Sequence, residues 1–337
     1  MVYRKLVVVA AVARARGKIL ANSEGQGGKV ALGKMRIVIV GSGGRLGAAL
    51  LREYRDKFDV TGFSHAELDL SDLDAVRETL RATSFDVVIN AAGFTKVDLC
   101  EAQPDRAFLI NAQTPRVIAE ICAEKNARLI HFSTDYVFDG AKCEPYTEED
   151  EAKPISVYGE SKLAGENNVL AVHGQNLVVR VSWVFGPDRP SFIDAMIQQA
   201  RKNEKVDAVA DKFSTPTYTL DIAEMLGYIL NGWSRRAPAP GGPVGGRLQG
   251  ILHFANAEQC NWQEYAQWAV DCCLDVGLPL KAKTIGARKL RDMTNWVARR
   301  PVYSVLSTAK YRKFTGVSPR TWREAVSDYI TRFYSKK

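Results

Sequence analysis

The chain alternates between short apolar runs and longer stretches in which apolar and polar residues recur at helical spacing. Five apolar runs, at residues 36–40, 60–63, 86–90, 129–132 and 177–181, predict strands. The segments between them, at residues 48–54, 73–81, 102–125 and 157–169, predict helices. Because strands and helices take turns along the chain, the pattern indicates an α/β fold with a doubly wound parallel sheet and right-handed crossovers.

The regular alternation ends near Pro187. Beyond it the pattern predicts helices at residues 192–202, 220–230, 262–276 and 321–333, and a Pro/Gly-rich surface loop at residues 234–247. We therefore expect a first domain over residues 35–186. Residues 187–337 should form mainly a smaller C-terminal lobe, with some segments that return to the first domain.

Residues 1–34 precede the first predicted strand and carry a glycine-rich spacer at residues 25–28. Met35 opens the first strand and resembles a natural protein start. We expect residues 1–34 to be a disordered N-terminal extension, or the product of an upstream start codon. A targeting peptide and a structured addition are the alternatives, although the order of charged and apolar residues is poor for a secretory signal.

A glycine-rich turn follows the first strand and opens the first helix. Gly41, Gly44 and Gly47 fit the spacing G-x-x-G-x-x-G, whereas the tighter G-x-G-x-x-G form fails at Leu46. Residues without a Cβ atom let backbone N–H groups and the helix N-terminus approach a pyrophosphate. In this strand–turn–helix context the glycines predict a Rossmann-type dinucleotide site, and a tight turn without a ligand is the alternative.

The second strand bears on which dinucleotide binds. Dinucleotide folds that use NADH often place Asp or Glu at its end, and no acidic residue occurs among residues 62–65, which include Ser64. Arg45 in the glycine turn lies close in sequence to the expected phosphate site. We therefore expect NADPH as the cofactor, with NADH as the alternative. The third strand ends in Ala91-Ala92-Gly93, where small side chains leave room for a flat ring or a ribose.

Tyr158 and Lys162 stand four residues apart in a stretch rich in helix formers, so they share one helical face. The Lys ammonium should favour the phenolate and lower the pKa of Tyr158, which suits that side chain to proton transfer near neutral pH. Thr134 and Asp135 follow the fourth strand, at the end where parallel sheets bind ligands. A solvated i, i+4 pair is the alternative for the Tyr and Lys spacing alone.

Charge and cysteine content exclude several other classes of protein. The net charge is +8, but residues 1–34 hold seven basic residues and one acidic residue, so residues 35–337 carry only +2. A nucleic-acid partner thereby loses its main support. No run of about 18 apolar residues predicts a membrane span. The six cysteines form no C-x-x-C pair and the four histidines lie far apart, which favours free thiols in a reducing cytoplasm and no metal site.

Seven motifs together resemble one family, the extended short-chain dehydrogenase/reductases, and within it the dTDP-4-dehydrorhamnose reductase family. They are GSGGRLG at 41–47, NAAGFTKVD at 90–98, HFSTDYVFDG at 131–140, VYGESKLAGE at 157–166, RVSWVFG at 180–186, FSTPTY at 213–218 and ARRPVYSVLSTAK at 298–310. Their order and spacing cover about nine-tenths of the chain. The extension at 1–34 and the loop at 234–247 depart from the family pattern.

The resemblance implies roles for individual residues. Tyr158 would be the proton donor, Lys162 its electrostatic partner and a ribose ligand, and Thr134 would tune the tyrosine. The NAD(P)-binding set would be Gly41, Gly44, Arg45, Leu46, Gly47, Ser64, Asp69, Leu70, Ala92, Gly93 and Thr95, together with Tyr158 and Lys162. The substrate-binding set would be Thr134, Asp135, Trp183, Arg299 and Arg300, with Trp183 as a wall of the sugar site. A core tryptophan and a structural arginine pair are the alternatives.

The resemblance also implies the reaction. It predicts NAD(P)H-dependent reduction of the 4-keto group of a deoxysugar nucleotide, in particular dTDP-4-dehydrorhamnose to dTDP-L-rhamnose. It leaves open a dependence on Mg²⁺ and a homodimer. The alternatives are another nucleotide-sugar epimerase, dehydratase or reductase, and a non-catalytic cofactor-binding regulatory subunit like that of methionine adenosyltransferase. The intact set of Thr134, Tyr158 and Lys162 favours an enzyme.

Overall fold

Six parallel strands form the central sheet of the computed structural model, which describes residues 34–234 and 248–335. The strands are β1 (Arg36–Val40), β2 (Asp59–Phe63), β3 (Val87–Asn90), β4 (Arg128–Thr134), β5 (Leu177–Val181) and β10 (Gly250–His253), in the order β10-β5-β4-β3-β1-β2. All five neighbouring pairs are parallel. The predicted Rossmann-type fold and its five strands are confirmed. The predicted N-terminal extension lies outside the described residues, as does nearly all of the Pro/Gly-rich loop.

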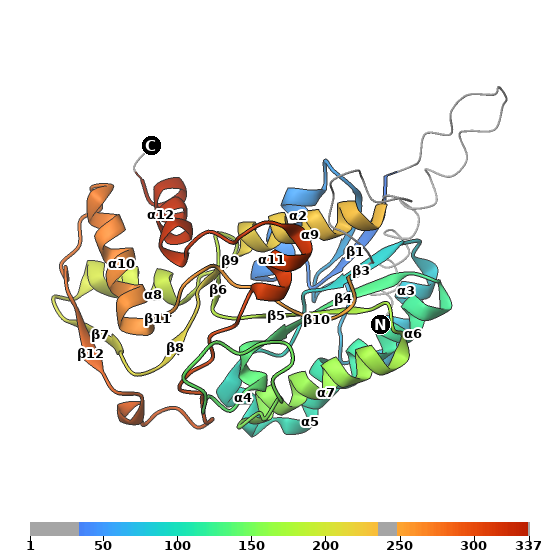
Figure 1. Ribbon diagram of the computed structural model, residues 1–337, viewed down its shortest axis with the longest axis horizontal. Coiled ribbons are helices and arrows are strands. Elements are labelled where there is room, and N and C mark those ends of the chain that lie inside the picture. The colour runs from blue at the N-terminus through green and yellow to red at the C-terminus, as the bar shows by residue number, and fades with distance from the viewer. Residues whose placement is uncertain (1–33, 235–247, 336–337) are drawn as a thin grey trace.

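Helices cover both faces of this sheet, as the apolar strands require. Ile37 and Ile39 of β1 pack with α2 (Arg45–Tyr54) and α9 (Thr219–Ser234). Val38 and Val40 point to the opposite face and pack with α3 (Leu73–Ala82) and α6 (Thr114–Glu124). Figure 1 shows α2 and α9 on one side of the sheet, and α3, α6 and α7 (Val157–Val172) on the other. β2 and β3 flank β1, so the strand order reverses at the glycine turn.

The predicted helical segment over residues 102–125 is confirmed, although it is divided into several elements. The segment contains the end of α4 (Val97–Ala102), then α5 (Pro104–Phe108), a π-helical turn (Leu109–Gln113) and α6. Pro104 and Pro115 each stand in the first turn of a new helix. Gln103, just before Pro104, leaves the helical backbone conformation and separates α4 from α5. The backbone stays helical through Phe108, Gln113 and Thr114, so α5, the π-helical turn and α6 are continuous.

Segments beyond residue 186 return to the first half of the chain. β10 adds the edge strand beside β5, in register from Gly250 opposite Leu177 to His253 opposite Arg180. Buried side chains of α9 and of α11 (Ala309–Thr315) join the core beneath β1 and β5. β10 was missed because it has only four residues and lies between loops. The domain boundary at residue 186 stays a prediction.

The remaining elements form a second, mainly helical lobe. It contains α8 (Phe192–Lys202), α10 (Trp262–Asp275) and α12 (Trp322–Phe333), with the strand pairs β7–β12 (Val206–Val209, Ile285–Arg288), β8–β11 (Phe213–Ser214, Cys260–Asn261) and β6–β9 (Val184–Phe185, Thr217–Tyr218). Figure 1 shows α8, α10 and α12 beside the central sheet. Cys272 and Cys273 lie in this core, as predicted, and Cys143 is the exposed thiol among six free cysteines.

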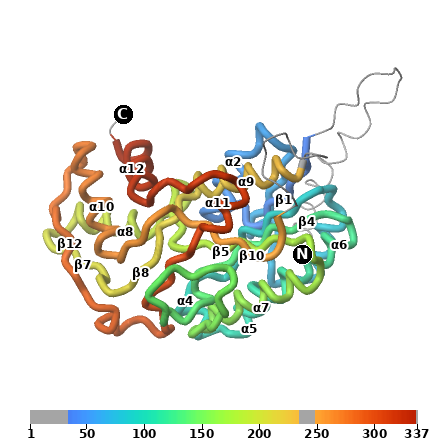
Figure 2. The backbone as a smooth tube through the Cα atoms, in the orientation of Figure 1, coloured from blue at the N-terminus to red at the C-terminus, as the bar shows by residue number. Residues whose placement is uncertain are grey.

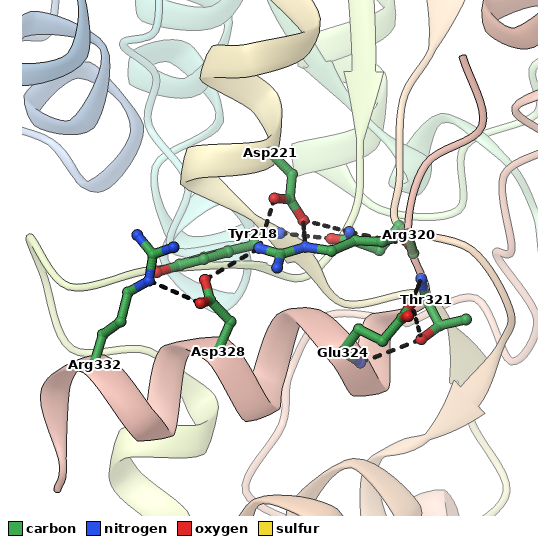
Figure 3. Close-up of polar contacts among 8 residues, drawn as sticks. Tyr218, Asp221, Arg320, Thr321, Glu324, Asp328 and Arg332 are labelled. Atoms are coloured by element: carbon green, nitrogen blue, oxygen red, sulfur yellow. Dashed lines mark hydrogen bonds and ion pairs between the residues drawn. The ribbon is translucent and has the colours of Figure 1, made fainter.

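A charged cluster fixes this lobe against the sheet half of the molecule. Arg320, just before α12, donates to both carboxylate oxygens of Asp221 in α9, at 3.0 and 2.8 Å (Figure 3). Asp328 of α12 lies 3.3 Å from the same guanidinium and also accepts from Arg332 at 2.7 Å. Thr321 and Glu324 complete a capping box at the start of α12. A bidentate Arg–carboxylate pair specifies geometry as well as attraction, so α12 is held in one position relative to α9.

Gly165 gives a test of how α7 is seated. A Cβ atom there would overlap the carbonyl oxygen of Asn111 in the π-helical turn. We predict that Gly165→Ala lowers the free energy of unfolding by about 1–3 kcal/mol, because backbone cannot move aside as a flexible side chain can. Gly227→Ala in α9 is the matched control, since its Cβ would meet nothing within 4 Å. Chemical denaturation should show Gly227→Ala to be slightly stabilised; equal stability of the two variants would contradict the prediction.

Candidate active site

The glycine turn forms a cradle at the carboxyl end of β1. Gly41 has φ +83°, and its N–H donates to the carbonyl of Phe63 in β2 at 2.8 Å. A Cβ atom on Gly47 would overlap the Gly41 carbonyl, so the turn requires glycine at both positions. Gly44 caps α2 with no side-chain hydrogen bond, and the first turn carries no acidic residue. The free backbone N–H groups at the start of α2 and the helix dipole therefore suit an anionic pyrophosphate.

The loop after β3 lies against this cradle. A Cβ atom on Gly41 would come within 2.8 Å of the Ala92 Cβ, and one on Gly93 would lie 3.9 Å from Lys162 Nζ. Ala92 and Gly93 are half-buried, whereas Thr95 is exposed. The structure thus brings the predicted small residues between the glycine turn and α7. Leu46 and Gly47 are buried residues in the first turn of α2.

Arg45 does not lie where the sequence predicted. Its guanidinium turns to the second lobe and donates to the carbonyls of Val184 and Arg189 at 3.1 Å each, and to that of Pro190. Burial lowers the pKa of Arg45. Arg189 in turn donates to the carbonyl of Gly43 at 3.0 Å. Arg45 therefore joins the lobes, and its expected support of a 2′-phosphate stays a prediction.

Ser64 lies beside the glycine turn, as predicted. Its Cβ atom is 3.3 Å from the position that a Cβ on Gly43 would take. Sequence analysis missed Glu67, whose carboxylate accepts from the Ser64 N–H at 2.8 Å. The Ser64 carbonyl accepts from the Glu67 N–H at 3.0 Å, so the two residues close a local turn. The S-x-x-E spacing was the available signal, and it places an acid at the end of β2 after all.

The predicted adenine contacts are ordered by local hydrogen bonds. The Asp69 carboxylate accepts from the N–H and hydroxyl of Ser71 at 3.0 and 2.7 Å, and the Ser71 N–H lowers the pKa of Asp69. Leu70 is buried, and its carbonyl accepts from the Thr114 hydroxyl at 2.7 Å. This turn therefore has a fixed shape at the carboxyl end of the sheet.

Tyr158 and Lys162 share one face of α7, and both are buried. The Tyr158 ring packs edge-on against Tyr136, with ring centres 5.6 Å apart. Burial raises the pKa of Tyr158, and a hydrogen bond with the Thr134 hydroxyl opposes that rise. The prediction that Lys162 lowers the pKa of Tyr158 is wrong for this structure, because the ammonium is directed elsewhere.

Lys162 Nζ donates to the carbonyl of Phe132 in β4 at 2.6 Å and lies 3.4 Å from His131 Nε2. Burial lowers the pKa of Lys162 to about 8, and the charge of Glu166, one turn further along α7, opposes the shift. Burial also lowers the pKa of His131, so that imidazole is neutral beside the ammonium. Lys162 is thus held between β4 and the loop that contains Gly93.

Asn111 is a site residue that sequence analysis did not assign. It is fully buried in the π-helical turn, and its amide accepts from the Phe94 N–H at 2.8 Å. The same amide donates to the Phe94 carbonyl and to the Ser161 hydroxyl of α7, each at 3.0 Å. π-Helical turns often occur at functional sites. The available signal was an asparagine inside a helical pattern, where it is unfavourable unless its side chain is used.

Thr134 and Asp135 continue from β4 towards Tyr158. The Thr134 hydroxyl donates to Asp135 Oδ1 at 3.1 Å and accepts from the Tyr136 N–H at 3.2 Å. Asp135 Oδ2 accepts from Ser304 at 2.5 Å and from Ser214 at 3.1 Å. Asp135 is therefore surrounded by hydroxyl donors of the protein itself, and its predicted contact with the sugar stays a prediction.

Trp183 lies at the junction between β5 and the second lobe. Its φ of +40° is uncommon for a residue with a side chain and costs free energy that the surroundings must offset. The half-buried indole packs near Trp262 and Tyr265, with ring centres 5.5 and 6.2 Å apart. Its buried N–H finds no hydrogen-bond partner among the described residues. A strained, partly open aromatic face agrees with the predicted wall of the sugar site.

The two predicted arginines differ. Arg299 is exposed, whereas the Arg300 guanidinium is nearly buried, donates to both oxygens of Asp98 at 3.1 and 2.6 Å, and stacks over Trp296 at 4.0 Å. Figure 2 shows the segment between β12 and α11 passing α4. Lys96, Val97, Asp98 and Leu99 line a cavity of about 490 Å³ beside it. Arg300 therefore closes this loop onto Asp98, and its predicted diphosphate clamp stays untested.

Comparison with known proteins supports a single family. A family profile described as "RmlD substrate binding domain" matches residues 35–335. The chain is 37% identical to a dTDP-4-dehydrorhamnose reductase of Mycolicibacterium smegmatis over 300 residues, which cover 88% of this chain and 85% of that one. The chain belongs to the dTDP-4-dehydrorhamnose reductase family.

Two further members frame what the family can do. The chain is 36% identical to a probable dTDP-4,6-dihydroxy-2-methyloxan-3-one 4-ketoreductase of Streptomyces antibioticus, over 87% of this chain and 94% of that one. A crystal structure of the dTDP-4-dehydrorhamnose reductase of Bacillus anthracis, in complex with NADP, superimposes with a TM-score of 0.80 at 28% identity. It covers 89% of this chain and 99% of that one. The family members are oxidoreductases that share this fold.

Two other classes of site were searched for in the described residues of this reductase-family chain. Across residues 34–234 and 248–335, no group of three His, Cys, Asp or Glu side chains is arranged to hold a metal ion. Within the same residues, no helix is long and apolar enough to cross a membrane.

The buried ammonium of Lys162 predicts a pH-dependent stability. Its pKa is about 8 in the folded chain and 10.5 in the unfolded one, so between these values the unfolded chain binds more protons. The free energy of unfolding of the wild type should therefore rise, relative to Lys162→Met, by about 1–2 kcal/mol from pH 8 to 9.5. Urea unfolding of both chains at the two pH values measures the difference. A constant difference would show that Lys162 titrates normally.

Proposed function

We propose that this chain reduces the 4-keto group of a dTDP-linked deoxysugar with NADPH, and that dTDP-4-dehydrorhamnose is the substrate and dTDP-L-rhamnose the product. The convergence of Thr134, Tyr158 and Lys162 beside the glycine cradle carries the proposal, because a proton donor and a dinucleotide site then share one edge of the sheet. Family membership supports the reaction class. The Streptomyces relative, which acts on a different 4-keto sugar, shows why the sugar needs a test.

The chain supplies groups that fit the cofactor. The uncapped start of α2 and the glycine turn would hold the pyrophosphate, the Ser64 and Asp69 turns would hold the adenosine half, and Gly93 with Lys162 would hold the nicotinamide ribose. When bound, the reduced nicotinamide supplies the hydride for sugar C4. The protein's part is to orient both molecules and to complete the reaction with a proton.

Tyr158 is the proposed proton donor to the C4 oxygen. Its pKa is raised, so the phenol stays protonated at neutral pH and is ready to donate. The resulting phenolate must be stabilised, and the Thr134 hydroxyl, whose hydrogen bond lowers the pKa of Tyr158, is placed for that purpose. Lys162 lies one turn further along α7. Because Lys162 has a pKa of about 8, its charge is available below that pH. Trp183 would orient the pyranose ring from the second lobe.

The alternative hypothesis is a regulatory subunit that binds the cofactor without reducing a sugar. The buried Tyr158, the strained Trp183 and the family's reductases favour the enzyme. NADPH and NADH oxidation with a panel of 4-keto sugar nucleotides tests this choice directly; cofactor binding without turnover would support the subunit. Homodimer formation, a cytoplasmic location and dependence on Mg²⁺ stay open to measurement.

Tyr158→Phe tests the proton donor. The variant keeps the ring that packs on Tyr136 and removes the one hydroxyl. We predict a fall in kcat of at least about 100-fold, which is the lower range for general acid catalysis, with an unchanged affinity for NADPH. Steady-state reduction of dTDP-4-dehydrorhamnose and cofactor fluorescence measure the two quantities. Full activity in Tyr158→Phe would remove Tyr158 from the mechanism.

Ser64→Asp tests the placement of the 2′-phosphate. Ser64 lies beside Gly43, so a carboxylate there should repel a 2′-phosphate and raise the KM for NADPH relative to that for NADH. Glu67→Gln is the matched control, because it removes an existing negative charge at the same turn. The KM ratio should move in the opposite direction in that variant. If the KM ratio for NADPH and NADH is unchanged in both variants, the adenosine 2′-position does not lie beside Ser64.

A further inference from the structure

A buried lysine that the reaction scheme does not use lies over Tyr136, the ring that packs against Tyr158. Lys212 is fully buried, and its ammonium donates to the Pro301 carbonyl at 2.7 Å. The ammonium also lies over two aromatic rings of the site, 5.1 Å from the centre of Tyr136 and 5.8 Å from that of Trp183. Burying an ammonium is costly unless an opposite charge or several acceptors offset the loss of water. The structure therefore requires a counter-charge for Lys212.

Asp135 is that counter-charge. Its carboxylate is 2% exposed and lies next in sequence to Tyr136, whose ring faces Lys212. Ser214, two residues after Lys212, donates to Asp135. Burial is the largest influence on both groups: it raises the pKa of Asp135 and lowers the pKa of Lys212 to about 8. The charge of each group opposes the shift in the other, so each favours the charged form of its partner.

The Asp135 charge reaches the proton donor by two routes. One is direct, because the negative charge raises the pKa of Tyr158 and so opposes the phenolate. The other passes through Thr134, whose single hydroxyl proton has two acceptors, Asp135 Oδ1 and the Tyr158 oxygen. Without a nearby positive charge, the Asp135 carboxylate would hold the hydrogen bond from the Thr134 hydroxyl. With the Lys212 charge nearby, that hydroxyl could instead donate its hydrogen bond to the Tyr158 phenolate as the phenolate forms.

We propose that Lys212 is a positioning residue of this site: its buried ammonium balances the Asp135 carboxylate, which lets Thr134 turn its hydroxyl to Tyr158 during proton donation. The inference rests on the proposed reduction with Tyr158 as donor. No covalent step is added, because the proton still moves from Tyr158 to the sugar oxygen. Lys212 acts on that step only through Asp135 and Thr134.

The other charged groups nearby are engaged elsewhere. Arg300 faces Lys212 but is paired with Asp98, and Lys162 is bound to the Phe132 carbonyl. The Ser304 and Ser214 hydroxyls face Asp135 but carry no charge. Tyr136 and Tyr158 have raised pKa values and are neutral. Within the described residues around Asp135, Lys212 is therefore the cation whose charge lowers the Asp135 pKa.

The test is a double-mutant cycle on the full chain with Lys212→Met, Asp135→Asn and the pair together. Lys212→Met should lower kcat roughly tenfold at pH 7.5, about the effect of one pKa unit on Tyr158, while the affinity for NADPH is unchanged. In the Asp135→Asn background the same Lys212→Met change should have little effect on kcat. Lys212→Arg keeps the charge and should retain most of the activity.

The pH profile separates this charge effect from simple loss of packing. Without Lys212 the pKa of Asp135 rises, so lowering the pH from 8 to 5.5 neutralises Asp135 in Lys212→Met. The kcat of that variant, relative to wild type, should therefore recover as the pH falls, and the double variant should show no such recovery. An equal loss of kcat in both backgrounds, at all pH values, would overturn the proposal.

Thermal unfolding of the same four chains gives a readout without substrate. Lys212→Met leaves Asp135 buried without a counter-charge, so its Tm should fall, and the double variant should regain part of that loss. If the Tm changes of the two single variants simply add in the double variant, the charge pairing is overturned. This result does not depend on kinetic measurements of Lys212→Met. Wild type that reduces no sugar, or Tyr158→Phe that stays active, would instead overturn the proposed function, and the unfolding cycle would still decide the pairing.

Discussion

The buried carboxylate of Asp135 joins segments that are far apart in the chain. Its oxygens accept from Thr134 in β4, from Ser214 in β8 and from Ser304 in the segment before α11. A buried carboxylate is tolerated only when its hydrogen bonds are satisfied, so these three segments must meet at one point. Lys212 contacts Tyr136, Trp183 and the Pro301 carbonyl close to the same carboxylate. The substrate side of the site therefore depends on protein groups that stabilise the negative charge of Asp135.

A second buried charge fixes the helix that carries Tyr158. Glu166 in α7 accepts from the Arg180 guanidinium of β5 at 2.9, 3.1 and 2.6 Å, and the two side chains are 0% and 3% exposed. His253 of β10 lies 3.4 Å from the same guanidinium. Removing one partner of such a pair leaves an uncompensated buried charge, so the pair strongly specifies where α7 lies. The returning strand β10 thus contributes to the position of the helix that carries Tyr158 as well as to the edge of the sheet.

The sequence predicted those parts of the site that depend on spacing within one element. The glycine turn and the Tyr158–Lys162 face follow from a strand–turn–helix pattern and from helical periodicity, and the structure places both where they were expected. The errors concern where long side chains end. Arg45 turns to the second lobe and Lys162 to the Phe132 carbonyl, because acceptors from distant segments decide those directions. Asn111 and Lys212 were missed for the same reason, since burial and cross-element hydrogen bonds give them their roles. Glu67 was missed although its partner Ser64 lies only three residues away.

Several unfavourable features collect at this one place. Two lysines with pKa values near 8, a tyrosine with a raised pKa and a tryptophan at positive φ surround the carboxyl ends of β4 and β5. Each costs stability. Raised tyrosine pKa values also occur in the apolar layer around β1, at Tyr54 and Tyr311, so the buried ammonium groups and the positive φ are what distinguish this site. Clustering of perturbed charges and backbone strain is typical of functional sites rather than of structural cores. These groups lower the stability of the folded chain, and a gain in transition-state stabilisation is the physical reason to retain them. Their cost in stability therefore argues for catalysis rather than for cofactor binding alone.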